Sequence, residues 1–570
     1  MVSDHPEPVK DASSALFPEG GAAPDAEIRP ALTGKDSAGD LRESLHLLFK
    51  SCPEHLKIYL RDFAHQSLGK LYARFFHEGT QPSPRFCEVL LREIKNTYPE
   101  AELTELKDSL CRQRYFFCAN HAGFENHPEL IAGSLLLSAV SAREKAGPVP
   151  LLTCTTLYPV NPTAPCGFLS GRRDPLRGFA RHRFALMARK WDNHFLSALP
   201  ALGFERVQRR LKDVPASDLT LTEKATLLKL SLEETADQGA GSFIRQSARD
   251  NSALYGRFLS ACPHTELYFT DCEKISSALI AEDVLRGDTF SARLFSDASL
   301  IYTLCKSLAG HDNLWSQERI IAHDPADASQ AALAPGMSSS DGNRLPPALS
   351  GARSSAAQPH PEVLHQQSEH YAGNGTVLFF LHRDNGKCAP LSLKRDGQGQ
   401  CHLVCPYGSL LLNPHNVAKA LREGRLIPTF YLAYMSLIFD HQVSLAGGIF
   451  FSHYIRDMLA ITARVLSLPL PPCFSPELIQ AFVTPFKVEI AAETGTLNHA
   501  HPLLNLDLRA LPPLSPALLE NVLQSTVEDC LPLTLADFAL DFTLTAEETV
   551  RYEKELLTAL RAPAPASFPL

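Results

Sequence analysis

The chain has 570 residues, of which 45% are hydrophobic and 21% are charged, and its formal net charge is −9. A chain of this length exceeds one ordinary hydrophobic core, so two or three domains, or one elaborated domain, are expected. The acidic balance argues against a general nucleic-acid binder, which needs a concentrated basic face.

The start of the chain predicts a tail followed by helices. Residues 1–40 are rich in Pro, Ala, Gly and Asp and lack the apolar stretch of a secretory signal, so we predict a disordered tail. Residues 41–110 repeat apolar side chains every three or four positions, which predicts a helical arm. The 14 cysteines are scattered and follow no secretory leader, which favours reduced thiols and a cytoplasmic location.

Residues 111–323 are predicted to form the first part of the core. The run YFFCAN predicts a strand, and a polar turn, a long apolar helix and a second strand-like run, VPLLTCT, follow it. This order predicts a βαβ unit with parallel strands. The expected fold class is therefore α/β, with a Rossmann-like parallel sheet core and large helical additions, including a helical region over residues 186–310.

The composition changes again in the second half of the chain. Residues 324–360 are mostly Ala, Ser, Pro and Gly, which predicts a flexible linker or disordered insertion. Residues 361–480 are assigned to the second part of the core and include a hairpin, PLSLKRDGQGQCHLVCP. The apolar run 427–439 is too short for a membrane span and predicts a buried helix. Residues 481–570 are predicted to be a C-terminal helical region.

The polar turn after the first predicted strand contains the first candidate site. Asn126, with Pro128 and Glu129 after it, is typical of a capped helix start. Helix-start chemistry does not explain His121, Gly123, Glu125 and His127, and Asn120 is a further ligand-binding candidate in the same turn. Loops after parallel strands lie at the carboxyl edge of the sheet, where helix amides bind anions, so they predict a phosphate or nucleotide site. The alternative is that the histidines only hydrogen-bond the loop.

A second candidate segment is SLAGGIFFSHYIRDM, residues 444–458. It places Gly447 and Gly448 before a predicted helix that carries Tyr454 and Arg456. Glycines allow a close approach of the backbone to a ligand. The alternative is an ordinary helix end followed by a packed loop.

A third candidate segment is RRDPLRGFARHRF, residues 172–184, which is rich in arginine. Arg172 and Arg173 suit bidentate binding of a phosphate or a carboxylate. The alternative is a solvated charged face. Cys401, His402 and Cys405 have a metal-like spacing without a second pair nearby, so we assign no metal ligands.

The first two segments together resemble the bacillithiol-synthase-like, cysteine-adding enzymes in a distant and degenerate form. Those enzymes have a nucleotidylyltransferase-like Rossmann core with a Gly-Gln-Gln-x-Gly or His-Gln-Pro turn after the first strand. Gly-Pro or His-Pro often follows at the start of the helix. Here Asn120-His121-Ala122-Gly123 takes the place of the turn, and His127-Pro128 stands at the helix start.

The family also has a Gly-Gly-Pro-x-Glu-x-x-Tyr element, with which Gly447, Gly448 and Tyr454 are in register. Ile449 replaces its proline and Phe451 its glutamate, so the ionisable group of that element is lost. The resemblance implies a Rossmann-like fold and a site that combines the two segments.

We consider three hypotheses for function. The first is a group-transfer or ligase-type enzyme for a small anionic metabolite or nucleotide, with His121, His127 and Glu125 as its candidate catalytic residues. In this hypothesis the two histidines stabilise charge and an arginine clamps the ligand. The second is acyl transfer, because Asn120-His121 resembles the Asn-His-x-x-x-x-Asp turn of glycerolipid acyltransferases. Asn126 replaces that aspartate, and Glu125 is one residue too close. The third is a non-catalytic binding or assembly protein on a decayed enzyme scaffold.

Overall fold

A computed structural model describes most of the chain between Phe63 and Pro569. The described residues are 63–118, 120–154, 167–172, 180–187, 191, 194–214, 219–232, 239–309, 378–389, 391–447, 451–471, 483–491, 497–539 and 564–569. The predicted tail at 1–40 and the predicted linker at 324–360 lie outside these residues.

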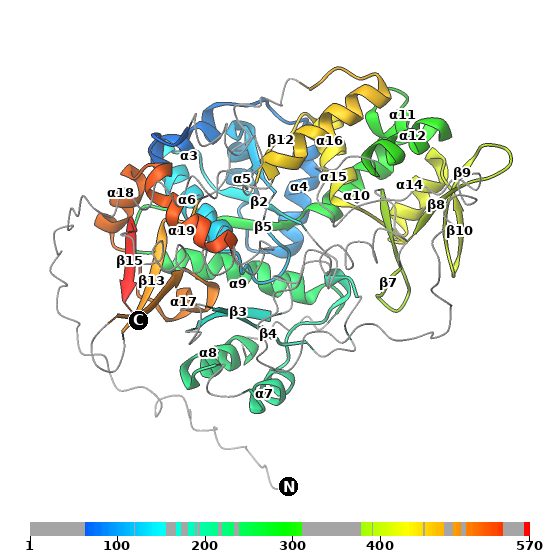
Figure 1. The fold of residues 1–570 in the computed structure, drawn as a ribbon. Coiled ribbons are helices and arrows are strands. Elements are labelled where there is room, and N and C mark those ends of the chain that lie inside the picture. Colours follow the sequence, from blue (N-terminus) through cyan, green and yellow to red (C-terminus); the bar gives the residue numbers. More distant parts are fainter. Residues whose placement is uncertain are drawn as a thin grey trace, which may run out of the picture.

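A four-stranded parallel sheet lies at the centre of a mixed α/β structure (Figure 1). Its strands are β1 (Tyr115–Phe117), β2 (Val149–Thr153), β5 (Leu267–Asp271) and β12 (Ser444–Ala446). Their order is β12-β1-β2-β5, and each neighbouring pair is parallel. Helix α6 (Pro128–Glu144) connects β1 to β2, which confirms the predicted βαβ unit.

The apolar character of these segments explains their position. Every residue of β1, β2 and β5 is buried, as expected for parallel strands that are covered on both faces. Helix α6 is buried on all sides from Pro128 to Ser141, which is typical of a helix inside a core.

Helices cover both faces of the sheet. The helices before it are α3 (Leu68–His77), α4 (Pro84–Thr97) and α5 (Leu103–Arg112). The ring of Phe75 in α3 packs edge-on against Phe117 at 4.8 Å, and Phe86 in α4 packs against Phe116 at 4.9 Å. Phe116 and Phe117 are adjacent in β1 and point to opposite faces, so α3 and α4 cover different sides. The predicted arm thus shares the core of the sheet.

A second, smaller core lies beside the turn that follows β1. Its elements are β3 (Gly167–Arg172), β4 (Ala180–Ala185), the 3-10 helix η3 (Leu196–Ala198), α7 (Phe204–Lys212), α8 (Leu221–Leu232) and α9 (Ser242–Phe258). Strands β3 and β4 form an antiparallel hairpin. Phe124 of the turn stacks on Phe168 of β3 at 4.6 Å and meets Phe243 of α9 edge-on at 5.5 Å. The turn is therefore anchored in this core.

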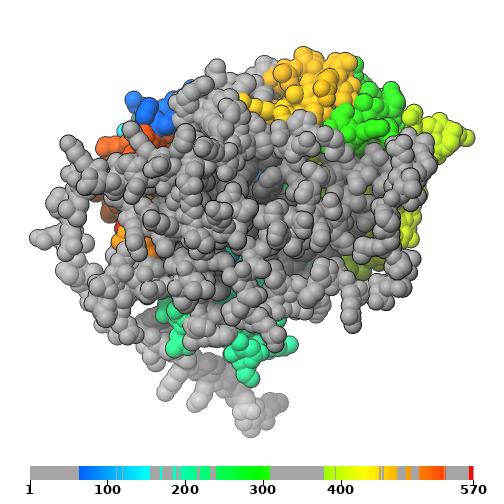
Figure 2. Space-filling view, in the orientation of Figure 1, coloured from blue at the N-terminus to red at the C-terminus, as the bar shows by residue number. Residues whose placement is uncertain are grey.

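The middle of the chain adds helices and small antiparallel sheets. They are α10 (Cys272–Asp283), α11 (Phe290–Ser296), α12 (Ala298–Ala309), β6 (Phe379–His382), β7 (Cys388–Ala389), β8 (Ser392–Arg395), β9 (Cys401–Cys405), β10 (Gly408–Leu411), α14 (Pro414–Arg422), β11 (Leu426–Pro428), α15 (Phe430–His441) and α16 (Phe451–Leu466). The pairing of β8 with β9 confirms the predicted hairpin. Helices α11 and α12 contact α16, and their side chains meet at the upper right of Figure 2.

Helix α15 confirms the predicted buried helix in the apolar run 427–439. Apart from the partly exposed Phe430, Phe439 and Asp440, all of its residues are buried. None of the helices that the structure describes is both long and apolar enough to cross a membrane.

The C-terminal region contains strands that the sequence analysis did not predict. Its elements are β13 (Phe486–Ala491), β14 (Leu497–Pro502), α17 (Asn505–Ala510), α18 (Pro516–Gln524), α19 (Val527–Ala539) and β15 (Ala566–Pro569). The strands form a sheet in the order β14-β13-β15. Alternation of side chains in FKVEIA is the signal for β13, since period-two alternation is typical of a half-buried strand.

Two buried titratable side chains meet where β14 leads into α17. Burial raises the pKa of Asp507 to about 8 and lowers the pKa of His501 to about 4. The Asp507 carboxyl accepts a hydrogen bond from the Leu504 N–H at 2.8 Å and lies 3.6 Å from His501 Nδ1. Near neutral pH both side chains are uncharged, so this contact is not an ion pair.

The free energy of unfolding should fall by about 1 to 2 kcal/mol between pH 6.5 and pH 8 because of Asp507. In that window the unfolded chain has ionised this carboxyl, whereas the folded chain holds its proton, so unfolding releases a proton and rising pH favours it. His501 has a smaller effect in the opposite direction, about 0.4 kcal/mol. Its unfolded imidazole is half protonated at pH 6.5 and loses that proton by pH 8, whereas the folded ring is already neutral. Urea denaturation at several pH values should show a smaller fall in Asp507→Asn, which keeps the acceptor for Leu504.

The control is Asp396→Asn. Hydrogen bonds from the Gln400 N–H and His402 lower the pKa of Asp396, so this carboxylate is ionised throughout the window. An Asp507→Asn variant with the same pH dependence as the parent chain would contradict the assignment.

Candidate functional site

The candidate site lies at the carboxyl edge of the parallel sheet, between β1 and β12. From β1 the chain continues to β2 on one side, and β12 lies on the other side. In open α/β sheets, ligands bind outside the carboxyl ends of the strands where the strand order reverses in this way. Phe117 pairs with Ala446, and the Cys118 N–H donates to the Ala446 carbonyl at 2.9 Å. The two predicted segments thus begin side by side.

The backbone of the turn after β1 also continues toward the end of β2. The Cys154 N–H donates to the Asn120 carbonyl at 2.7 Å, and the Ala122 N–H donates to the Cys154 carbonyl at 2.8 Å. Gly123 then has φ of +110°, a conformation that side chains disfavour. The Asn251 side chain of α9 donates to the Gly123 carbonyl at 2.9 Å. These bonds hold the turn against the end of β2 and against helix α9.

A buried carboxylate organises the rest of the turn. The Glu125 side chain is fully buried and accepts hydrogen bonds from three backbone N–H groups. The N–H of His121 donates at 3.0 Å, that of Asn126 at 2.9 Å and that of His127 at 3.0 Å. Glu125 was predicted to be catalytic, and its contacts hold the turn in shape. The carboxylate also takes up amides that an anionic ligand would otherwise bind.

The two predicted histidines lie together at the mouth of the turn. The rings of His121 and His127 are 4.6 Å apart between centroids and tilted by 47°. Both residues are partly exposed, and His121 Nδ1 lies 3.7 Å from a Glu125 carboxylate oxygen. Two imidazoles in this arrangement can donate hydrogen bonds to one anion, or exchange a proton with it, beside a buried negative charge.

The prediction that Asn126 caps helix α6 is wrong. The helix begins at Pro128, as predicted, but its N-cap residue is His127, and no side chain caps it there. The Asn126 side chain instead donates to the carbonyls of Phe124 at 2.9 Å and Gly167 at 3.1 Å, and accepts from the Leu169 N–H at 3.2 Å. Its amide both donates and accepts, so it attaches β3 to the turn.

The predicted arginine clamp is only partly described. Arg172 is the last residue of β3 and pairs with Ala180. Arg172 lies five positions after Gly167, whose carbonyl Asn126 bonds, so the Cα atoms of these two residues are about 16 Å apart. The side chain of Arg172, and Arg173 as a whole, lie outside the described residues.

Gly447 directly follows β12. A Cβ atom there would lie 2.7 Å from Cβ and Cγ of Phe451, so this position requires glycine. Phe451 packs edge-on against Tyr434 of α15 at 5.6 Å. Arg456 is half-buried on α16, and burial lowers its pKa below the ordinary value. Gly448 and the side chain of Tyr454 lie outside the described residues.

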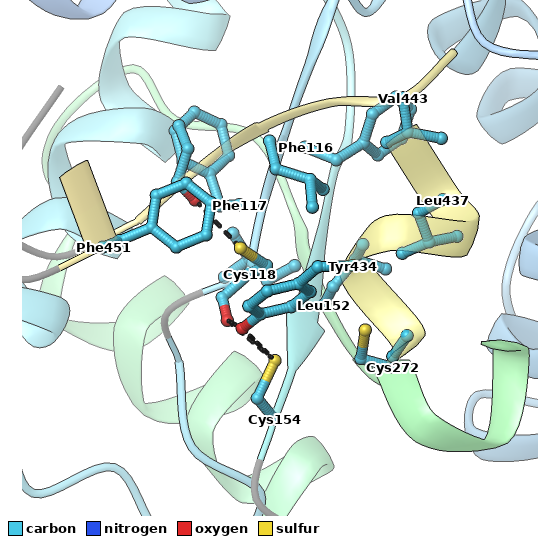
Figure 3. Close-up of a cluster of buried hydrophobic side chains, with 14 of the residues drawn as sticks. Phe116, Phe117, Cys118, Leu152, Cys154, Cys272, Tyr434, Leu437, Val443 and Phe451 are labelled. Carbon is cyan, nitrogen blue, oxygen red and sulfur yellow. Dashed lines mark hydrogen bonds between the residues drawn. The ribbon is translucent and has the colours of Figure 1, made fainter. Parts of the chain in front are cut away.

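The sequence analysis missed three thiols that line the same edge. Cys118, Cys154 and Cys272 immediately follow β1, β2 and β5, and all are buried (Figure 3). Burial raises the pKa of Cys118 and Cys154, so these thiols are protonated. The signal was a cysteine directly after each apolar run.

Tyr434 ties the ends of two strands to helix α15. Its hydroxyl donates to the Cys118 carbonyl at 3.0 Å and lies 2.9 Å from Cys154 Sγ (Figure 3). At the next strand end, Asp271 caps helix α10 by accepting from the Lys274 N–H at 3.0 Å. Burial raises the pKa of Asp271 to about 6. The edge therefore combines neutral thiols with a weakly acidic carboxyl group.

Metal-binding clusters are not present within the described part of the chain. His402 instead contacts Asp396 at 3.0 Å, and the Cys401 thiol donates to the Ala298 carbonyl at 3.2 Å. Comparison with models of protein families, with curated proteins and with solved structures yields no match to this chain.

Glu125→Gln should lower the free energy of unfolding by about 2 to 4 kcal/mol. Glutamine keeps only one acceptor oxygen and turns an NH2 group toward backbone N–H donors. Urea denaturation measures the loss. The control is Glu144→Gln at the other end of α6, where a partly exposed carboxylate contacts His77 at 2.8 Å and should contribute less than about 1 kcal/mol. Equal stability of the two variants would show that the amide contacts are unimportant.

Proposed function

We propose that the parallel sheet is a Rossmann-like core that binds a small anionic metabolite or a nucleotide. Numbered along the chain, β1, β2, β5 and β12 have the spatial order 3-2-1-4, which is the order of the first four strands in the doubly wound dinucleotide-binding fold. The observation that carries the proposal is the pairing of β1 with β12, which brings the histidine turn beside Gly447 at the strand-order reversal.

Side chains, more than helix N–H groups, would bind the negative charge of the ligand. Glu125 already accepts from the N–H groups of Asn126 and His127 next to the start of α6. The imidazoles of His121 and His127 are therefore the donors we assign to a phosphate or oxyanion, and Arg456 is a further cation on the neighbouring helix. Preorganised donors of this kind stabilise charge that develops during group transfer. The resemblance to cysteine-adding enzymes supports a transferase or ligase of this type.

A nucleotide or phosphorylated metabolite at a hundred times its dissociation constant should raise the free energy of unfolding by about 2.7 kcal/mol. Thermal denaturation with a panel of nucleotides, phosphorylated sugars and carboxylic acids measures this shift. His121→Ala and His127→Ala should abolish it without lowering the stability of the unliganded protein by a similar amount.

His415→Ala is the matched control, because His415 is an exposed histidine in the first turn of another helix, α14. This variant should keep the full shift. If no ligand in the panel stabilises the parent chain, or if the shift survives both histidine substitutions, the proposed anion site is wrong.

The proximity of Glu125 to His121 makes acyl transfer a second candidate function. The acid of the acyltransferase turn is replaced by Asn126, yet the carboxylate of Glu125 reaches within 3.7 Å of His121 Nδ1. A carboxylate on this side orients the ring and leaves Nε2 as general base. His121 would remove the proton of an acceptor hydroxyl as its oxygen attacks the carbonyl of an acyl thioester. The thiol would leave with that proton.

Mixing the chain with an acyl thioester and glycerol phosphate distinguishes the two candidates. Acyl transfer predicts release of thiol and formation of the ester, with a rate at least about 100-fold lower in His121→Ala. Ligand stabilisation without thiol release would exclude acyl transfer. It would leave the anion site, either in a group-transfer enzyme or in a non-catalytic binding protein.

A further inference from the structure

A serine, a histidine and an aspartate form a hydrogen-bonded chain away from the carboxyl edge. Ser83 Oγ lies 2.8 Å from His441 Nδ1, and His441 Nε2 lies 2.8 Å from an oxygen of Asp283. Ser83 directly precedes α4, whereas His441 and Asp283 are the last residues of α15 and α10. A nucleophile that contacts a base, which in turn contacts an orienting acid, is the signature of an activated hydroxyl.

The carboxylate determines how the protons are arranged. An ionised Asp283 only accepts hydrogen bonds, so Nε2 of His441 must carry the proton that it donates. In a neutral ring Nδ1 is then the acceptor, and the Ser83 hydroxyl donates to it. In serine proteases Nε2 faces the serine and Nδ1 faces the aspartate, whereas here Nδ1 faces Ser83 and Nε2 faces Asp283. One ring nitrogen still accepts from the serine, and the other still donates to the acid.

The surroundings hold these groups in place. The Ser83 N–H donates to the His441 carbonyl at 2.8 Å, and Thr80 Oγ1 donates to the Gln442 carbonyl at 2.8 Å. His441 and Asp283 are almost fully buried, at 3% and 2% exposure. The charged groups near Asp283 are Arg286, at 3.4 Å, and Asp440, whose carboxylate accepts from Ser291. Asp440, the residue before His441, also interacts electrostatically with this imidazole.

Ser83 is also partly exposed at the start of a 14-residue helix. The Phe86 N–H donates to Ser83 Oγ at 3.2 Å, which leaves the hydroxyl proton directed at His441. Pro84 has no N–H, and Arg85 lies in the first turn of α4, where an α-helix leaves its N–H groups without an intrahelical acceptor. The positive end of the helix and this amide are suited to an oxygen that becomes negative next to Ser83.

The cluster is separate from the candidate site described above. The segment around Thr80 and Ser83 bonds to the residues that lead into β12, including Ser444, the first residue of that strand. It therefore lies at the amino end of β12, whereas Gly447 follows the carboxyl end.

We propose that Ser83, His441 and Asp283 form a second site, which cleaves small carboxylic esters. The Ser83 oxygen attacks the ester carbonyl as His441 Nδ1 takes its proton. The bond between the carbonyl carbon and the alcohol oxygen breaks, and His441 returns the proton to the leaving alcohol. Water then attacks the acyl-serine, His441 again transferring the proton, and the carboxylic acid is released.

The same chain contains a matched serine without the histidine. Ser515 precedes Pro516 at the start of α18 and accepts from the Leu518 N–H at 3.3 Å, as Ser83 precedes Pro84 and accepts from Phe86. Both are helix-capping serines followed by proline. If capping alone explains Ser83, the two hydroxyls should be equally unreactive.

The test is reaction of the full-length chain with phenylmethanesulfonyl fluoride, followed by peptide mapping. The proposal predicts that Ser83 is modified at least about 100-fold faster than Ser515, and that Ser83→Ala, His441→Gln and Asp283→Asn lose this reaction. p-Nitrophenyl acetate hydrolysis should fall in parallel in these variants and remain unchanged in Ser515→Ala. Because the mapping uses the unsubstituted chain, it does not depend on whether a variant folds.

Two results would overturn the proposal. One is modification of Ser83 no faster than of Ser515 in the folded parent chain. The other is ester hydrolysis that persists in Ser83→Ala while thermal denaturation shows that this variant is folded.

Discussion

A carboxylate removed from water must be met by donors, and the way in which Glu125 is met determines the shape of the whole turn. Its oxygens accept from the N–H groups of His121, Asn126 and His127. These amides would otherwise be unsatisfied in a buried loop next to a helix start. These bonds hold the backbone of both histidines in place, and α6 begins at Pro128, the next residue. Phe124, in the same turn, packs into the neighbouring core.

The second constraint is the burial of the sheet on both faces. Strand β12 has only three residues, yet it occupies the outer position beside β1. Its place depends on packing around it: Tyr434 binds the end of β1, and Phe451 fills the space that Gly447 leaves. The carboxyl edge is therefore stabilised by apolar and neutral polar contacts, and the charged groups lie at its margins.

The sequence predicted those elements whose residues carry a recognisable pattern within a short stretch of chain. Apolar runs, the polar turn between the first strand and its helix, and the turn residues of the hairpin were sufficient for the βαβ unit, for α15 and for the β8–β9 pair. A three-residue strand such as β12 carries no such signal, and only its partner β1 defines it. The strands β13 to β15 show that alternation in FKVEIA was overlooked.

The candidate site was predicted less completely than the fold for the same reason. The position of the histidine turn followed from the strand before it, but the role of Asn126 depends on Gly167, which is distant in the sequence. The contact between Ser83 and His441 joins opposite halves of the chain, and no spacing rule anticipates it. The thiols at the strand ends were visible as a repeated position after apolar runs, although their common location required the strand order.

The double attachment of Asn126 makes the hairpin β3–β4 and the histidine turn one mechanical unit. The Asn126 side-chain amide hydrogen-bonds the backbone of Phe124 in the turn and of Gly167 and Leu169 in β3. These bonds restrict movement of the turn relative to the strand. The position of β3 and the position of the residue before His127 therefore depend on the same amide group. A substitution that shortens or removes this side chain would release the hairpin and the histidine turn from each other at once.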